Sequence, residues 1–270
     1  MNSILYKQFE HDAVQWVKEA SKILIDQEHS FTITTQKDVL DVATSADIAV
    51  EKFLTQKILE KYPDHAIDGE EMGLSHKDTS YVWIIDPLDC TKEYVKGIGQ
   101  YNILLACEEK GQLVVGIVKR FGHTMVYRSS KGNGAYVENT KLHVSSVSTL
   151  DHAFIGTNFP CKKRNSDKEI NSYVQLLGKF VKHVYRLRPT PDDARMFSWV
   201  AQGAYEGGIS IPASNKWFDV APALLLIEEA GGKVSDWKGN SLKNHDVSKG
   251  IVASNGLVHD EILNIVKEAI

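Results

Sequence analysis

The chain has 270 residues and a formal net charge of −4, with 43% hydrophobic and 24% charged residues. This length is enough for one large or two small α/β domains with a real core. The sequence has no basic run and no excess of Lys and Arg, which argues against a nucleic-acid polymer as the main partner. We expect neither a secretory leader nor a membrane span, because the first residues lack an apolar core and no stretch is long enough to cross a bilayer.

The cysteines give an expectation about the redox compartment. Cys90, Cys107 and Cys161 are odd in number and scattered along the chain. This pattern argues against a disulfide framework, so we expect a reducing, cytoplasmic location.

The first half of the chain predicts helices followed by a sheet. Apolar residues recur at three- and four-residue spacing over residues 11–25, which is typical of an amphipathic helix. Ser45 is suited to cap a second helix over residues 46–61. Alternating or β-branched runs predict strands at residues 31–37, 65–68, 82–85, 101–107, 113–120, 124–127 and 135–137, with turns at 108–111, Gly122 and 131–134. Such a meander indicates a partly antiparallel sheet.

The second half alternates between strand and helix patterns. Strands are predicted at residues 153–157, 184–187, 209–211 and 251–253, and helices at 167–181, 192–204, 217–230 and from about 257. Gly231 and Gly232 are suited to close the third of these helices, and residues 236–240 to form a turn. The alternation predicts helices stacked on a sheet, so we expect an N-terminal α+β part, residues 1–148, and a C-terminal α/β part, residues 149–270.

Carboxylates gather at the end of one predicted strand. The bulky run at residues 82–85 is followed by Asp86 and then by Pro87, which cannot extend a ladder, so the strand is predicted to stop there. Asp89, three residues on, can turn toward the same point as Asp86, and Thr91 adds a hydroxyl. Converging oxygen ligands suit a hard cation such as Mg²⁺. The alternative is a solvated Asp-Pro-x-Asp turn.

Three separated motifs resemble one family. Gly69-Glu70-Glu71, the segment 86–91, and Trp217-Phe218-Asp219 with the following 229–232 are similar in order and spacing to motifs of the inositol monophosphatase family. Members are Mg²⁺-dependent, lithium-sensitive phosphatases of small molecules. The resemblance covers nearly the whole chain. It implies an α/β (α+β) fold, a layered α-β-α-β-α sandwich of the inositol monophosphatase/fructose bisphosphatase type, and a homodimer.

The resemblance also implies a set of metal ligands. One Mg²⁺ would be held by Glu70, Asp86 and the backbone carbonyl of Leu88, and a second by Asp86, Asp89 and Asp219. A further, weaker ion is implied near Glu70, so that two or three ions serve one site. Taken alone, Asp219 would be interpreted as the N-cap of a buried helix.

A mechanism follows from the same resemblance. The ions would neutralise the phosphate ester and activate a water as the nucleophile, without a covalent phosphoenzyme. Thr91, hydrogen-bonded to Asp47, would accept the proton, and the backbone amides of Cys90 and Thr91 would hold the phosphate. The catalytic residues are therefore predicted to be Asp47, Glu70 and Thr91. Taken alone, Asp47 would be interpreted as a favourable charge in the first turn of a helix.

The sequence departs from the family pattern where substrate selectivity is expected. Cys90 stands where the family usually has Gly, a residue that allows positive φ or a close backbone approach. Pro212 stands where inositol-selective members tend to carry Glu, and the segment 186–193 replaces a loop of small residues. Arg186, Arg188 and Lys216 could bind a second phosphate of the substrate. The alternative is that they are solvated, or paired with the acids at 192–193.

Short matches point to one branch of the family. Lys92-Glu93-Tyr94, Lys216-Trp217 and Ala221-Pro222 are similar to the 3′(2′),5′-bisphosphate nucleotidase branch. We therefore predict a Mg²⁺-dependent phosphomonoesterase acting on a small phosphorylated substrate such as an inositol monophosphate. Two alternatives stay open, a bisphosphate nucleotidase and a catalytically weak regulatory or binding protein with the same fold.

Overall fold

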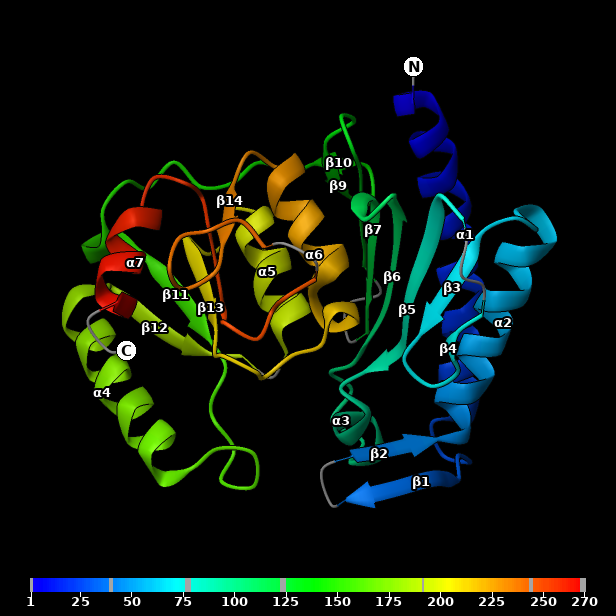
Figure 1. Ribbon diagram of the computed structural model, residues 1–270, viewed down its shortest axis with the longest axis horizontal. Coiled ribbons are helices and arrows are strands. Elements are labelled where there is room, and N and C mark those ends of the chain that lie inside the picture. Colours follow the sequence, from blue (N-terminus) through cyan, green and yellow to red (C-terminus); the bar gives the residue numbers. More distant parts are fainter. Residues whose placement is uncertain are drawn as a thin grey trace. The chain divides into compact units, whose positions relative to one another are not determined.

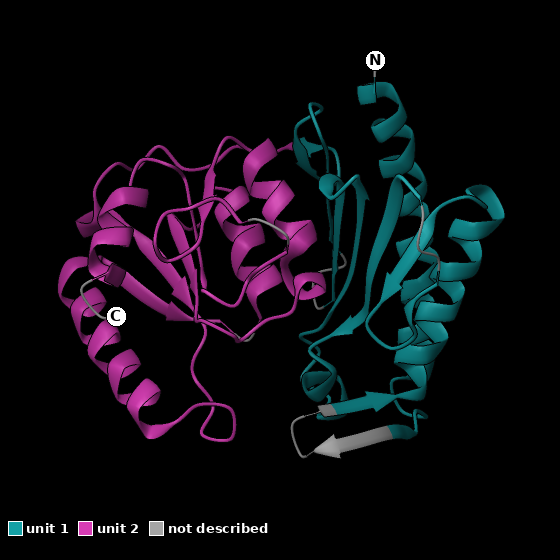
Figure 2. Cartoon of the chain, viewed as in Figure 1, with its two compact units in different colours: residues 1–140 teal, residues 141–270 magenta. Residues whose placement is uncertain are grey.

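The computed structural model describes residues 2–38, 41–75, 79–121, 125–190, 192–242 and 245–267 (Figure 1). The chain forms two compact units, residues 1–140 and 141–270 (Figure 2). The functional division at residues 148 and 149 stays a prediction. Gly122, Thr124 and Pro191, which fall in predicted turns, strands or loops, lie outside the described residues.

The first unit packs two helices on one face of a sheet. In the described residues the sheet has eight strands in the order β10-β9-β8-β7-β6-β5-β3-β4. The helices are α1 (Asn2–Gln27), α2 (Ser45–Lys61) and the short α3 (Thr91–Val95). The strands are β3 (Ala66–Gly69), β4 (Gly73–Leu74), β5 (Tyr81–Asp89), β6 (Asn102–Glu109), β7 (Gln112–Arg120), β8 (Val126–Ser130), β9 (Ala135–Val137) and β10 (Thr140–Lys141), beside a separate hairpin of β1 (Ile33–Asp38) and β2 (Asp41–Thr44). The predicted antiparallel meander is confirmed, since β5 to β9 pair antiparallel in sequence order.

The core of this unit lies between the helices and alternate residues of the strands. Trp83 and Ile85 of β5 join one buried cluster with Phe9 and Val17 of α1 and Leu54 of α2. Residues two apart on a strand share a face, so this spacing directs the bulky side chains of β5 toward the helices. This packing fixes the position of α2 relative to β5.

Both helices begin elsewhere than predicted. α1 starts at Asn2 rather than at residue 11, because its first turns also pack on the sheet: Tyr6 is buried and its hydroxyl donates to Glu109 Oε2 over 2.5 Å. The N-cap of α2 is Thr44, not Ser45, which is already helical. Thr44 Oγ1 accepts from the amide of Ala46 at 3.2 Å, and Asp47 Oδ2 accepts from the amide of Thr44 at 2.8 Å. This capping box uses Asp47 as its acid.

The strand that carries Asp86 continues past it, so the predicted stop at Asp86 is wrong. β5 runs to Asp89, and its register with β6 shifts between Asp86, opposite Leu104, and Asp89, opposite Asn102. Two residues, Pro87 and Leu88, therefore face one residue of β6, which is a β-bulge. A bulge accepts proline because the missing N–H is not needed there for the ladder.

The second unit has helices on both faces of a mixed sheet. In the described residues the sheet has five strands in the order β12-β11-β13-β15-β14. β11 is parallel to β12 and β13, whereas β15 is antiparallel to β13 and β14. The elements are a 3₁₀ turn (Leu150–His152), β11 (Phe154–Thr157), α4 (Asp167–His183), β12 (Arg186–Pro189), α5 (Asp193–Ala201), β13 (Gly207–Ser210), α6 (Trp217–Glu229), β14 (Lys233–Ser235), β15 (Ile251–Ser254) and α7 (His259–Lys267). The predicted elements are all found with shifted ends, and β14 was not predicted.

Glycines let α5 lie close to this sheet. A Cβ on Gly156 of β11 would be 2.7 Å from Met196 Cγ, and one on Gly208 of β13 would be 2.9 Å from the same atom. The opposite face carries Ile155 and Ile209, which join a buried cluster with residues of α4 and α7. The predicted helix end at Gly231 is also found, since Gly231 has φ 92° directly after the last residues of α6.

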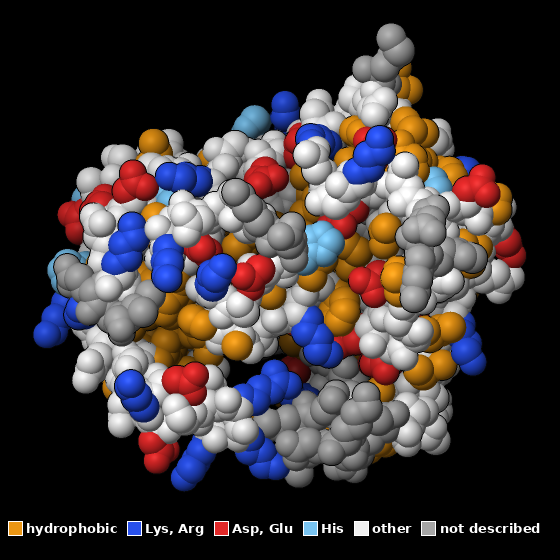
Figure 3. Space-filling view, in the orientation of Figure 1, with side chains coloured by type: hydrophobic (Ala, Val, Ile, Leu, Met, Phe, Trp, Pro, Cys, Tyr) orange, Lys and Arg blue, Asp and Glu red, His pale blue; other side chains and the backbone are white. Residues whose placement is uncertain are grey.

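Two global expectations can be compared with the structure. In the part of the chain that is described, no helix combines the length and the apolar character that crossing a bilayer requires. Acidic and basic side chains are both spread over the face shown in Figure 3. The three cysteines are all described, and each is a thiol.

Candidate metal and phosphate site

Two of the predicted ligands, Glu70 and Asp86, are brought together by neighbouring parallel strands. β3 and β5 are parallel neighbours, with Gly69 opposite Ile85 at the end of the register. The amide of Glu70 donates to the carbonyl of Ile85 at 3.1 Å. Because Gly69 pairs with Ile85, Glu70, the first residue after β3, comes to lie beside Asp86, which is still within β5.

The segment after Asp86 supplies further oxygen atoms. Asp86 is 2% exposed, and its Oδ1 accepts from the amide of Leu88 at 3.1 Å. Asp89 Oδ2 accepts from Asn102 Nδ2 at 2.6 Å. The carbonyl of Leu88 accepts from Thr91 Oγ1 at 2.9 Å, and a carbonyl oxygen has a second lone pair to offer. This donor set in the first unit is all oxygen and mostly carboxylate, which fits Mg²⁺.

Thr91 also contacts Asp47, as the family resemblance implied. Thr91 Oγ1 lies 3.2 Å from Asp47 Oδ1, while Asp47 Oδ2 accepts from Thr44 Oγ1 at 2.5 Å. Asp47 is 2% exposed, and burial raises its pKa although hydrogen bonds from Thr44 and Thr91 lower it. The carboxylate is therefore fixed by donors on both oxygens, with Oδ1 turned to Thr91.

Cys90 has the backbone conformation that glycine favours. Its φ of 68° and ψ of 45° are left-handed, and α3 begins at the next residue. A residue with a Cβ is disfavoured there, which explains why a glycine-containing motif fits this turn. The amides of Cys90 and Thr91 lie at the opening of α3, where phosphate binding was predicted.

Sequence reasoning missed Glu51. This residue lies four positions after Asp47 on α2, is 0% exposed, and accepts hydrogen bonds from the amides of Glu71 at 2.9 Å and Met72 at 2.8 Å. Burial raises its pKa, and the neighbouring charges of Glu70 and Asp47 act in the same direction. The available signal was its position between Val50 and Leu54, both on the apolar side of the helix.

In the second unit, Asp219 lies in the first turn of α6 and accepts a hydrogen bond from the backbone of the N-cap residue. The N-cap of α6 is Lys216, and Asp219 is the third helical residue, so the interpretation of Asp219 as N-cap is wrong. Its Oδ2 accepts from the amide of Lys216 at 2.7 Å. The Lys216 side chain is exposed, with Nζ 5.3 Å from the centre of the Phe218 ring.

The two candidate arginines lie on an edge strand. Arg186 and Arg188 are two residues apart on β12 and exposed. Their guanidinium groups lie over Tyr185, at 4.6 Å, and Phe154, at 5.6 Å. The salt bridge that the structure gives Asp192 is to Arg195, at 2.9 Å, rather than to either arginine.

Asp193 organises the segment that leads to Lys216. It is 5% exposed, and its Oδ2 accepts from Asn158 at 2.9 Å and Asn215 at 2.6 Å. Ser210 Oγ adds a third donor at 3.3 Å. Burial raises the pKa of Asp193 to about 7. The sequence analysis gave Asp193 as a possible partner of the nearby cations, whereas the structure makes it a buried hydrogen-bond acceptor for Asn158, Asn215 and Ser210.

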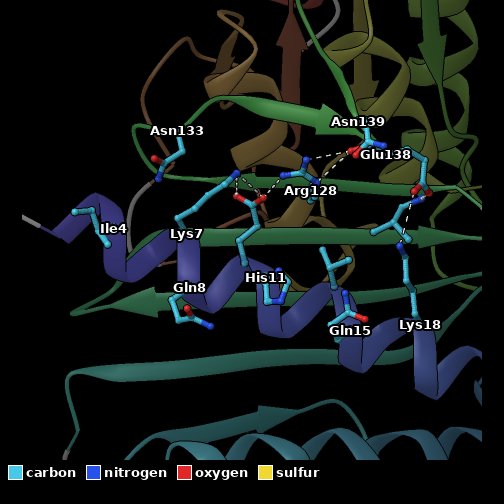
Figure 4. Close-up of a pocket in the computed structure, with 13 residues that line it drawn as sticks. Ile4, Lys7, Gln8, His11, Gln15, Lys18, Arg128, Asn133, Glu138 and Asn139 are labelled. Carbon is cyan, nitrogen blue, oxygen red and sulfur yellow. Dashed lines mark hydrogen bonds and ion pairs between the residues drawn. The ribbon is translucent and has the colours of Figure 1, made fainter.

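A separate pocket of about 630 Å³ lies between α1 and β8 (Figure 4). None of the predicted site residues lines it. Its charged groups pair with one another: Glu10, 1% exposed, accepts from Lys7 Nζ at 2.9 Å, from Ser130 Oγ at 2.5 Å and from Arg128. Because Glu10 is already paired within this pocket, the acids of the β3–β5 region, Glu70, Asp86 and Asp89, are the stronger candidate site.

Comparisons with known proteins show which family combines this mixed α/β fold with these acidic residues. The profile of the inositol monophosphatase family matches residues 6–270. A Pseudomonas aeruginosa protein named Nus factor SuhB is 31% identical over 236 residues, 86% of this chain and 85% of its own length. The chain therefore belongs to the inositol monophosphatase family, and the predicted family and fold class are confirmed.

Two further comparisons show the range of related proteins. A Thermotoga maritima protein named fructose-1,6-bisphosphatase/inositol-1-monophosphatase is 30% identical over 234 residues, 85% of this chain and 84% of its own length. The crystal structure of an IMPase/NADP phosphatase complexed with Mg²⁺ and phosphate has a TM-score of 0.82 at 22% identity, covering 97% of this chain and 95% of that one. This last likeness concerns the fold alone.

Proposed function

We propose that the chain is a Mg²⁺-dependent phosphomonoesterase of a small phosphorylated molecule such as an inositol monophosphate. The observation that carries this proposal is the arrangement at the end of β5. Glu70 follows the end of β3 beside Asp86 of the parallel strand β5, the Leu88 carbonyl lies in the bulge after Asp86, and Asp89 ends the strand. Family membership and the name of the Thermotoga relative support it.

The proposed ligands are those that the family resemblance implied. Glu70, Asp86 and the Leu88 carbonyl would hold one Mg²⁺, and Asp86, Asp89 and Asp219 another. Bound Mg²⁺ would neutralise phosphate charge and lower the pKa of the attacking water. The number of ions, inhibition by lithium, a homodimeric state and a cytoplasmic location remain parts of the proposal.

The chain's own groups handle the proton and the phosphate. The single proton of the Thr91 hydroxyl can point to the Leu88 carbonyl, 2.9 Å away, or to Asp47 Oδ1, 3.2 Å away. With that proton turned to Asp47, Thr91 Oγ1 takes the proton of the attacking water as it passes its own to Asp47 Oδ1. Asp47 stays in place during this transfer because Thr44 holds its other oxygen. The amides of Cys90 and Thr91, at the opening of α3, bind phosphate oxygens without a cationic side chain.

Replacing Asp89 tests the proposal directly. Asp89→Asn removes one ligand charge but keeps an oxygen that can accept from Asn102, so we expect normal folding and a loss of at least about 100-fold in kcat. The measurement is phosphate release from an aryl phosphate with Mg²⁺ and with EDTA. Asp64→Asn, at an exposed position of the same unit, is the matched control. Near-normal turnover of Asp89→Asn at saturating Mg²⁺ would refute the ligand assignment.

A second candidate is a 3′(2′),5′-bisphosphate nucleotidase. The exposed cations Arg186, Arg188 and Lys216 favour it, because a second phosphate needs positive partners. One sequence cue is weaker than it looked: Tyr94 is 1% exposed and its hydroxyl donates to the carbonyl of Leu24 at 2.7 Å. It is a core residue rather than a substrate contact.

A substrate panel separates these candidates. We expect kcat/KM with Mg²⁺ to be highest for an inositol monophosphate, compared with adenosine 3′,5′-bisphosphate, fructose 1,6-bisphosphate, histidinol phosphate and AMP. Lys216→Ala should leave that preference unchanged, because one phosphate is already held by metal and backbone amides. A preference for the nucleotide bisphosphate that collapses in Lys216→Ala would instead establish the nucleotidase.

A regulatory or binding role is the third candidate, and the name Nus factor SuhB of one relative favours it. The aryl phosphate assay also addresses this role. A protein that binds Mg²⁺ but releases no phosphate from any member of the panel would fit a non-catalytic function.

A further inference from the structure

Glu51 connects helix α2 to the turn that carries Glu70. The turn lies between β3 and β4, and both oxygens of the Glu51 carboxylate contact it. Oε2 accepts from the amide of Glu71 at 2.9 Å, and Oε1 accepts from the amide of Met72 at 2.8 Å. The side chain is 0% exposed, so these backbone amides replace water as its hydrogen-bond donors.

The same carboxylate lies against the residue before Glu70. A Cβ placed on Gly69 would be 2.0 Å from Glu51 Oε1 and 2.5 Å from Glu51 Cδ. Residue 69 is therefore restricted to glycine by the position of Glu51, although its own φ is not positive. Glu51 thus limits the backbone on both sides of Glu70, by contact at 69 and by hydrogen bonds at 71 and 72.

We propose that Glu51 is a positioning residue for the metal site: it fixes the turn so that the Glu70 carboxylate is presented beside Asp86. The third restraint on Glu70 is the bond from its amide to the carbonyl of Ile85 at 3.1 Å. This inference rests on the proposed function, since Glu70 needs a fixed position only if it binds a cation. Groups that orient a ligand without touching the metal typically change metal affinity about 10- to 100-fold.

A purely structural role explains the burial of Glu51 less well. Burying a carboxylate is unfavourable, and neutral amides compensate the lost hydration only in part. The like charges of Asp47 and Glu70 nearby add to this cost. A residue chosen for stability alone at this position would be apolar, as its neighbours Val50 and Leu54 on the helix are.

The first experiment compares Glu51→Gln with Glu60→Gln. Gln keeps the length of the side chain but turns an NH₂ group toward one of the two amides, so one hydrogen bond is lost. Glu60 is exposed on the same helix and serves as the matched control. We expect Glu51→Gln to bind Mg²⁺ at least 10-fold more weakly in substrate-free calorimetry, and Glu60→Gln to bind it as the parent does.

A second readout needs neither metal nor substrate. Hydrogen exchange at the amides of Glu71 and Met72, measured on metal-free protein, should accelerate at least 10-fold in Glu51→Gln while amides of β5 keep their protection. Parent-like Mg²⁺ affinity together with parent-like exchange in Glu51→Gln would overturn the proposal. The exchange result also separates the role of Glu51 from the proposed function. If the parent hydrolyses no phosphate ester, but the amides of residues 71 and 72 lose protection in Glu51→Gln, the proposed function fails and the contact role of Glu51 stands.

A double-mutant cycle tests the contact with Gly69. Gly69→Ala in the parent forces its methyl group onto Glu51 Oε1, so Mg²⁺ affinity should fall at least 10-fold with the Glu51 carboxylate still present. In Glu51→Ala the obstacle is gone, so adding Gly69→Ala should change the affinity by less than threefold. Equal fold-changes in both backgrounds would show that the two residues act independently and would contradict the proposal.

Discussion

Cys90 has a left-handed backbone conformation, which is unfavourable for any residue with a Cβ. Cys90 has φ 68° and is only partly exposed, with its side chain against the core of the first unit. The left-handed conformation costs a residue with a Cβ roughly 1 kcal/mol relative to glycine. The contacts of the thiol offset part of this cost, so a simple comparison of Cys with Gly mixes two effects.

Comparing Cys90→Gly with Cys90→Ala separates these effects. Both variants lack the thiol and differ only in the Cβ, so we expect Cys90→Gly to be more stable than Cys90→Ala by about 1 kcal/mol in urea unfolding. Gly178 provides the opposite case, because it lies inside α4 with nothing within 4 Å of an added Cβ. Gly178→Ala should raise stability by about 1 kcal/mol. Equal stability of the two residue-90 variants would mean that this turn relaxes to another conformation.

At the level of elements, α7 is attached to its sheet through a buried histidine. His259 is 0% exposed; its Nε2 lies 2.9 Å from Ser235 Oγ on β14, and its Nδ1 lies 2.8 Å from Ser254 Oγ on β15. Ser235 donates its own proton to the carbonyl of Asp236, so it accepts from the ring. This network assigns the neutral tautomer with the proton on Nε2.

The neutral ring makes the docking of α7 sensitive to acid. Burial lowers the pKa of His259 from 6.5 to about 4. A group whose pKa is depressed in the folded state binds its proton more readily when unfolded, so the stabilisation is complete above pH 6.5 and is lost as the pH falls toward 4. Asp193 acts in the opposite direction, because its pKa is raised to about 7 and protonation favours the folded state. The stability of the parent alone therefore cannot isolate His259.

The difference between parent and His259→Asn isolates it, since Asp193 is common to both. We expect the stability advantage of the parent to shrink by about 2 kcal/mol between pH 8 and pH 5, as unfolded His259 takes up a proton that the folded ring excludes. Urea unfolding at several pH values measures this difference. An advantage that stays constant across that range would show that the folded ring titrates normally.

At the scale of the whole molecule, patterns that depend on local sequence were predicted well. The motif order identified the family and the fold class, and helices with clear termini were placed within a few residues. α4 is an example: the helix predicted over residues 167–181 spans Asp167–His183, and its start is closed by a capping box of Ser166 and Glu169, residues only three apart in the sequence. The hydrogen bond between Thr91 and Asp47 was also expected, although only from the family resemblance.

Features that depend on tertiary contacts were missed. The start of α1 was placed too late: Tyr6 and Phe9 continue the apolar spacing of residues 11–25 toward the N-terminus, and the sheet supports this first part of the helix through Tyr6. β5 passes Pro87 because β6 accepts a bulge there, which no local propensity reports. Glu51 and Asp193 look like solvated acids, since charged residues are normally exposed, and only the fold reveals their buried donors.

The sequence analysis assigned a role in the chemistry to one residue of helix α2, Asp47, yet Glu51 stands one turn further along the same helix. One rigid element thus carries both the proton acceptor beside Thr91 and the support of the Glu70 turn. Its far end is attached to α1, where Asp12 Oδ1 accepts from Lys61 Nζ at 2.6 Å. Selection on the activity therefore extends to the buried contact between Asp12 and the end of α2, although Asp12 belongs to no motif.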